Sequence, residues 1–356
     1  MLYPGTRSTF VIAAASLLVA SALAQRPVAT QFAAAEYAKP GPAKVETYST
    51  TWHDAKRGRA VPVKLYYPRG DTVCPLIVFS HGLGGSNEGY GYLGEHWASH
   101  GFASLHLQHV GSDRGVLAKG GVKELVKATT DPNEFMNRAA DVTFALDHVL
   151  ELDQADPKKL DPPNKQPPFP LHKRIDTAHL GMSGHSFGAN TTVTIGGVSH
   201  PLLAGEKSLA DSRVKAIAPL STPVMKTDTP ERLKKLYAGI AIPSLHMTGT
   251  ADDSPIGDTP AAARRLPYDH STNAERILLT FDGGTHMLFG GRVEFRNRER
   301  DRRYQAEIQQ ATTIFWNAYL RDDAAARSWL LEPSGMTVAY RGDAVVETAA
   351  PKPGLK

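Results

Sequence analysis

One stretch of this sequence decides the fold: Leu180-Gly181-Met182-Ser183-Gly184-His185-Ser186-Phe187-Gly188-Ala189-Asn190. It begins as an apolar run and continues into small and β-branched residues, which predicts a buried strand followed by a helix. Between the two, Gly-x-Ser-x-Gly predicts a sharp turn with Ser186 at its apex. Glycine at both flanking positions removes side chains that would collide there, and the amides at the helix start can stabilise negative charge formed at Ser186.

Short apolar runs alternate with helical patterns along most of the chain. Strands are expected at 45–68 (two antiparallel strands), 76–79, 102–107, 177–182, 214–220, 242–247 and 277–281. Helices are expected at 88–100, 133–152, 189–195, 301–320 and 324–331. The alternation predicts an α/β fold with a mostly parallel central sheet of about eight strands and helices on both faces.

The catalytic domain is expected to cover residues 25–331 as a single unit. Within it, residues 155–173 contain six prolines, which predicts an irregular surface insertion. Residues 332–356 include prolines at 333, 351 and 353 and are expected to form a flexible C-terminal tail.

Residues 1–24 have the pattern of a secretory signal peptide, with Arg7, an apolar run over 10–20 and an Ala-x-Ala site that predicts cleavage after Ala24. A membrane anchor is the alternative, but the run is short for the ~20 residues of a spanning helix, and no later stretch could span a bilayer. The mature protein is therefore expected to be secreted or periplasmic. Loss of Arg7 lowers the formal charge from +4 to +3, which predicts no nucleic-acid partner. The single cysteine, Cys74, excludes an intrachain disulfide.

A serine becomes a strong nucleophile when a base removes its proton and a carboxylate holds that base. The strand at 242–247 leads into a loop that contains Asp252 and Asp253, and the strand at 277–281 leads into a loop that ends at His286. Loops at the carboxyl ends of parallel strands lie along one edge of the sheet, where Ser186 is also expected. The sequence therefore predicts a triad of Ser186, His286 and Asp252.

Taken alone, each residue of this triad also has a non-catalytic explanation. The serine pattern also occurs in simple turns, His286 could be a loop histidine, and Asp252 could cap a helix that begins near Asp258. Asp253 is the alternative acid. The order serine, aspartate, histidine on three successive strand exits favours the catalytic interpretation.

Two backbone amides are needed to bind an oxyanion, and Leu83 and Phe187 are expected to supply them. Gly82, Gly84 and Gly85 allow the loop around Leu83 to turn inward, although a plain glycine-rich turn is the alternative. No Lys-Ser/Thr pair follows that loop, which excludes a phosphate-binding loop. No metal-ligand spacing is present, so neither a metal nor an organic cofactor is expected.

Three segments resemble platelet-activating-factor acetylhydrolase and the bacterial dienelactone-hydrolase-like proteins: Phe79–Gly84, Leu93–Gly101 and Gly184–Gly188. The likeness extends over residues 45–331. It implies an α/β-hydrolase fold and a serine carboxylic-ester hydrolase with Leu83 and Phe187 as oxyanion donors.

The sequence also departs from these families. In the plasma-type acetylhydrolase the acid follows strand six, whereas here that strand ends in Leu220-Ser221-Thr222 without a carboxylate, so the acid is assigned to Asp252. Dienelactone hydrolases carry a cysteine where this chain has Ser186. Polyester-degrading cutinases have a similar layout, but their C-terminal disulfide is excluded here.

The sequence thus predicts an exported serine esterase that acts on a small-molecule or lipid ester. The short segment after strand six leaves no room for a large cap, which favours a fairly open site and short acyl groups. The same triad could serve a thioesterase, a peptidase, a perhydrolase or a polyester hydrolase. A non-catalytic binding protein of the same fold is the alternative from a different class.

Overall fold

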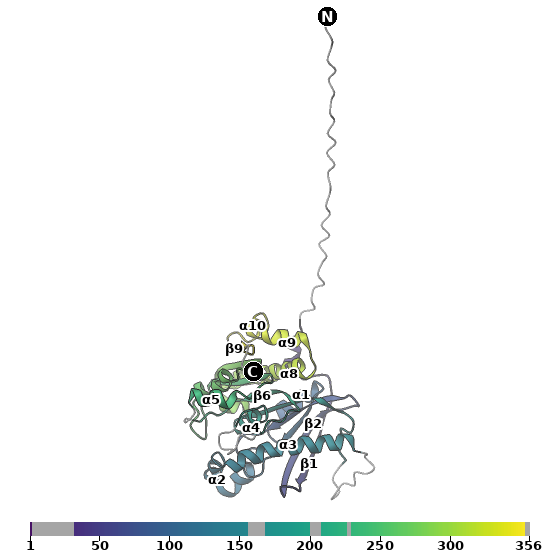
Figure 1. The fold of residues 1–356 in the computed structure, drawn as a ribbon, viewed down its shortest axis with the longest axis vertical. Helices are drawn as coiled ribbons and strands as arrows, with labels where there is room; N and C mark the ends of the chain where they lie inside the picture. The colour runs from purple at the N-terminus through teal and green to yellow at the C-terminus, as the bar shows by residue number, and fades with distance from the viewer. Residues whose placement is uncertain (2–31, 156–167, 200–207, 226–228, 353–356) are drawn as a thin grey trace. The chain divides into compact units, whose positions relative to one another are not determined.

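The computed structural model describes Met1 and residues 32–155, 168–199, 208–225 and 229–352. Over these residues nine strands form one sheet in the order β1-β2-β4-β3-β5-β6-β7-β8-β9 (Figure 1). Strands β3 to β8 are parallel, whereas β1 and β2 at one edge and β9 at the other are antiparallel to their neighbours. The expected α/β fold with a mostly parallel sheet is confirmed.

The described strands are β1 Val45–Asp54, β2 Arg59–Pro68, β3 Cys74–Ser80, β4 Ala103–Leu107, β5 Ile175–His185, β6 Val214–Leu220, β7 Ser244–Ala251, β8 Arg276–Thr285 and β9 Ala344–Ala349. The described α-helices are α1 Gly91–Ser99, α2 Arg114–Ala128, α3 Pro132–Gln154, α4 Phe187–Ile195, α5 Pro230–Tyr237, α6 Leu266–His270, α7 His286–Phe289, α8 Arg298–Leu320, α9 Ala324–Leu331 and α10 Met336–Ala339. The expected helices at 133–152, 301–320 and 324–331 correspond to α3, α8 and α9.

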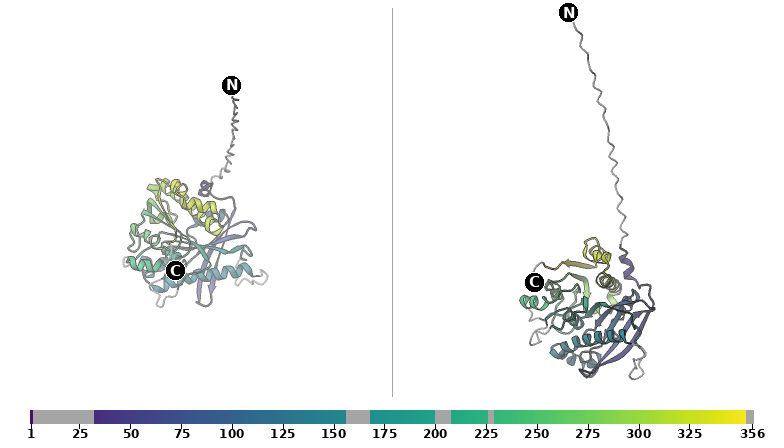
Figure 2. Two further views of the ribbon diagram at one scale, coloured as in Figure 1. Left: turned by 45° about the horizontal axis from the view of Figure 1, so that its top comes forward. Right: turned by 45° about the vertical axis from the view of Figure 1, so that its right-hand side comes forward.

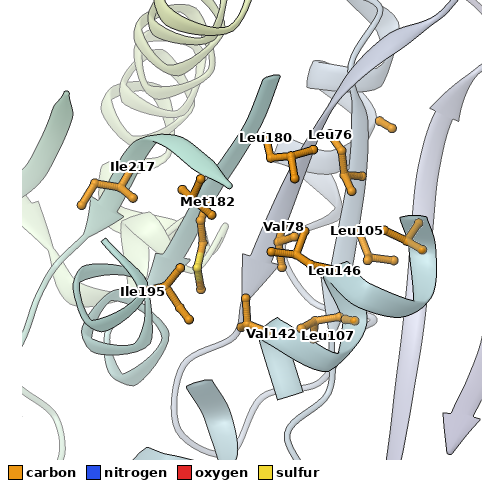
Figure 3. Packing of buried hydrophobic residues seen from close by; sticks show 14 of the residues in the cluster. Leu76, Val78, Leu105, Leu107, Val142, Leu146, Leu180, Met182, Ile195 and Ile217 are labelled. Atoms are coloured by element: carbon orange, nitrogen blue, oxygen red, sulfur yellow. The ribbon is translucent and has the colours of Figure 1, made fainter. Parts of the chain in front are cut away.

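Helices cover both faces of the sheet, because successive side chains of a strand point to opposite sides. Leu180 and Met182 of β5 pack with Val142 and Leu146 of α3, as Figure 3 shows. Gly181, between them, faces α8, where a Cβ would lie 3.0 Å from the ring of Trp316. Figures 1 and 2 show the strands between α3 (teal) and α8 (yellow).

The C-terminal segment corrects one expectation. Residues 332–356 were expected to be a flexible tail, but α10 and β9 lie within them, and β9 pairs with β8 from Arg276↔Ala349 to Phe281↔Ala344. The exposed edge of β8 offers unpaired amides and carbonyls, and β9 satisfies them. Ion pairs from Arg303 to Asp343 (2.7 Å) and from Arg265 to Glu347 (3.0 Å) hold the segment in place. The folded unit therefore extends beyond residue 331, and the sheet has nine strands where about eight were expected.

The predicted signal peptide at 1–24 and most of the proline-rich insertion at 155–173 lie outside the described residues. From Ala33 onward the chain forms one compact unit. Across the part of the chain that is described, no helix is both long and apolar enough to cross a membrane.

Candidate active site

Ser186 lies between the end of β5 and the start of α4, in a strained backbone conformation. Its φ is 56° and its ψ is −118°, a region that residues other than glycine rarely adopt. The two flanking glycines are required by close packing: a Cβ on Gly188 would collide with the carbonyl oxygen of Ser80, and one on Gly184 with the carbonyl of Gly188. The turn is therefore the sharp strand-to-helix turn that the sequence predicted, and it directs Ser186 into a cavity.

The cavity has a volume of about 710 Å³ and lies where the parallel strands end. Ser186 and His286 both line it, as do Leu83 and Phe187. The rest of its wall is largely apolar and comes from Phe135, Val198, Val224, Met225, Leu236, Ile256 and Met287, among others.

His286 and Asp252 form a hydrogen-bonded pair at the wall of this cavity. The Nδ1 of His286 lies 2.8 Å from the Oδ1 of Asp252, and both side chains are buried. A carboxylate can only accept a hydrogen bond, so Nδ1 carries the proton and Nε2 is left as the basic nitrogen. The structure thus brings Asp252 and His286 into direct contact and places Ser186 and His286 on the same cavity.

Asp253, the alternative acid, is placed elsewhere. Its side chain is exposed, and its Oδ1 accepts a hydrogen bond of 3.0 Å from the amide of Ala261. The geometry therefore favours Asp252 over Asp253 as the partner of His286.

Ser221 and Thr248 donate to the carboxylate of Asp252, and Arg264 forms an ion pair with it while its Nε donates to the main-chain carbonyl of Asp252 (2.6 Å). The sequence analysis did not identify any of these three residues. Ser221 lies 2.7 Å and 2.6 Å from the two carboxylate oxygens, Thr248 lies 2.9 Å from Oδ2, and the Nε of Arg264 lies 3.0 Å from Oδ1. All three are buried. A detectable signal did exist for Ser221, which stands at the exit of β6 where the resembling family carries its acid.

The loop that contains Leu83 is held from several directions. Its neighbour Gly82 donates its amide to the hydroxyl of Tyr90 (3.1 Å), and Gly84, at φ 73°, donates to the carbonyl of Ser112 (2.9 Å). Leu83 and Phe187 then lie at the cavity wall on the two segments expected to supply oxyanion donors.

Arg138 of α3 contacts both the loop around Leu83 and the helix α4 that begins at Phe187. Its guanidinium is fully buried and donates to the hydroxyls of Ser80, Ser112 and Thr191 and to the carbonyl of His81. It also lies over the ring of Phe187, 4.6 Å from the centroid. Burial lowers the pKa of Arg138 to about 9, so the group is charged at neutral pH.

His185, which precedes the nucleophile, connects the oxyanion loop to the histidine segment. One ring nitrogen lies 2.9 Å from the hydroxyl of Tyr90, and the other lies 3.1 Å from the carbonyl of His286. Burial, followed by the nearby charges of His286 and Arg264, holds the pKa of His185 well below its usual value. The ring is therefore neutral and acts as a rigid link.

Metal binding has no support among the side chains that the structure describes. No group of three or more histidine, cysteine or acidic side chains is placed to share an ion there. The buried His109 instead contacts the hydroxyl of Ser80 (2.9 Å) and the carboxylate of Asp141 (3.0 Å).

Comparison with known proteins gives two results. The family described as platelet-activating factor acetylhydrolase, isoform II, matches residues 64–126. Three cutinases, Cutinase 1 of Thermobifida cellulosilytica, the cutinase of Thermobifida fusca (strain YX) and Cutinase est1 of Thermobifida alba, are each 24% identical over 227 residues. The matched region is 63% of this chain and 64%, 56% and 57% of those proteins, which is less than two thirds of their length.

Proposed function

We propose that this chain, an α/β-hydrolase in its fold and its sequence likeness, is a serine carboxylic-ester hydrolase. The observation that carries the proposal is the buried Asp252–His286 pair, joined at 2.8 Å, on the same cavity as Ser186. The likeness to the acetylhydrolase family and to cutinases supports ester hydrolysis as the reaction. Export by a signal peptide at 1–24 is part of the proposal and rests on the sequence pattern alone.

The reaction begins when the hydroxyl of Ser186 attacks the ester carbonyl carbon. Its proton passes to Nε2 of His286, and Asp252 stabilises the imidazolium that forms. When the tetrahedral intermediate collapses, the carbon–oxygen bond to the alcohol breaks and His286 returns the proton to the departing oxygen. Water then attacks the acyl-enzyme by the same route and releases the acid.

The negative oxygen of the intermediate is held by the amides of Leu83 and Phe187. Pre-positioned donors in a cavity shielded from water stabilise such charge strongly, because they need no reorganisation during the reaction. The start of α4 adds the positive end of its helix dipole at the same point.

Labelling with a serine-directed phosphonate tests the nucleophile. The wild-type protein should be labelled at Ser186, and Ser186→Ala should neither be labelled nor hydrolyse nitrophenyl esters, a loss of about 10⁴-fold or more in kcat. Ser183→Ala is the matched control, because Ser183 is a buried serine of the preceding strand β5 that donates to the carbonyl of Ala218. A wild-type protein that is not labelled would indicate a binding protein.

The acid is tested in the same assay. Asp252→Asn should lower kcat by about 10³- to 10⁴-fold, whereas Asp253→Asn should leave it unchanged. Equal losses in the two variants, or a loss in Asp253→Asn alone, would contradict the assignment. Thioester and peptide substrates in the same panel distinguish the proposed reaction from thioesterase and peptidase activity.

A further inference from the structure

Ser221 occupies an unusual position directly after β6. Its φ is 61°, and it is one of five non-glycine residues with positive φ in the described chain. Its backbone is held on both sides, since its amide donates to the carbonyl of Met247 (2.7 Å) and its own carbonyl accepts from Arg264 (2.7 Å). Its side chain is fully buried and lies behind the His286–Asp252 pair, out of reach of a substrate.

The hydroxyl of Ser221 contacts both members of that pair. It lies 2.6 Å from Oδ2 of Asp252, 2.7 Å from Oδ1 and 2.8 Å from Nδ1 of His286. A hydroxyl has one hydrogen to donate and two lone pairs to accept with. Because the carboxylate can only accept, the hydroxyl donates to Asp252, and its oxygen shares the Nδ1–H of His286 with Oδ1.

We propose that Ser221 is a positioning residue of the active site, which fixes the carboxylate and the imidazole in a single relative orientation. The inference rests on the proposed function, because it requires His286 to act as the base. The shared Nδ1–H has two acceptors on the same side of the ring, so rotation of the imidazole would break two hydrogen bonds. The strained backbone is what carries the hydroxyl to this point.

The proposal predicts an effect on turnover and not on substrate binding. Ser221→Ala should lower kcat by about tenfold or more, since small misplacements of a catalytic group are costly. KM for a nitrophenyl ester should stay unchanged, because Ser221 lies behind the cavity wall. Ser183→Ala, the same change at another buried serine, should keep wild-type kcat.

Ser221→Gly separates the hydroxyl from the backbone strain. Glycine adopts φ 61° without cost, so this variant should be at least as resistant to thermal unfolding as Ser221→Ala. It should nevertheless lose as much kcat as Ser221→Ala. A purely structural role of Ser221 predicts instead that the variant with the smaller loss of stability also has the smaller loss of kcat.

The experiment distinguishes failure of the positioning role of Ser221 from failure of the proposed esterase function. A wild-type protein without esterase activity would overturn the function itself. An active wild type together with full kcat in both Ser221 variants would overturn the positioning role. Loss in Ser221→Ala with retention in Ser221→Gly would also overturn it, because backbone strain and not the hydroxyl would then be responsible.

Discussion

At the scale of single residues, Arg138 shows how a buried charge can organise a site from outside it. Its hydrogen-bond acceptors are neutral oxygens: those of Ser80 and His81 before the Leu83 loop, of Ser112 before α2 and of Thr191 in α4. The neighbouring acid, Asp141, is paired instead with Arg57, Arg59 and His109. The guanidinium therefore donates hydrogen bonds in several directions at once, and the single ammonium group of lysine cannot do this.

We expect Arg138→Gln to lower both stability and kcat. Removal of the guanidinium leaves several buried acceptors without donors, which should cost about 3 kcal/mol or more in the free energy of unfolding. Arg138→Lys should recover only part of this loss. Urea unfolding measures the loss of stability, and the nitrophenyl-ester assay measures the loss of kcat. Arg213→Gln is the control, because Arg213 is partly exposed, pairs with Asp147 and Asp211, and should matter little to kcat.

At the scale of elements, two carboxyl groups meet where the C-terminal segment packs on α8. Glu307 of α8 lies near Asp343, and burial, reinforced by that neighbouring carboxylate, raises the pKa of Glu307 to about 8. Asp343 has a lowered pKa because Arg303 donates to it. The half-buried carboxyl of Glu307 is therefore protonated in the folded state at pH values where the unfolded chain has lost the proton.

The stability contributed by this group should fall as pH rises. Because the folded pKa lies above the unfolded value of 4.5, the contribution is complete below 4.5 and is lost as pH rises through about 8. Glu307→Gln mimics the neutral carboxyl and should flatten the decline. Thermal unfolding between pH 5 and pH 8 measures this, and equal slopes in the wild type and the variant would contradict it.

At the scale of the whole molecule, the cavity is assembled from segments between Gly82 and Arg292 in the chain. Its volume of about 710 Å³ lies within the range of pockets that hold drug-sized ligands, and its wall is mostly apolar. An acetyl group would fill only a small part of it. We therefore propose that the cavity takes longer apolar acyl or alcohol groups than the short acyl groups expected from the sequence.

We expect kcat/KM for nitrophenyl esters to rise from acetate to octanoate. Each buried methylene contributes about 0.8 kcal/mol when apolar surface leaves water, and the enzyme should convert part of this into a higher kcat/KM. A chain-length series measures the trend. A steady decrease from acetate onward would show that the cavity does not receive the acyl group.

The sequence by itself determined the strands β1 to β8, the helices α1, α3, α4, α8 and α9, and the strained turn at Ser186, but it did not indicate α2 or α5. These features are local: hydrophobic periodicity sets the elements, and the glycine spacing sets the turn. The sequence also indicated which exits would meet, because parallel strands place their carboxyl ends along one edge.

Only the tertiary structure decided which neighbours surround the predicted groups. Ser221, Thr248 and Arg264 reach Asp252 from three different segments, and no local pattern records that convergence. The strand β9 has two valines among polar and small residues, and it forms because the edge of β8 offers a partner. Contacts between distant segments depend on the packing of the whole sheet, and this is why they appear only once the chain is folded.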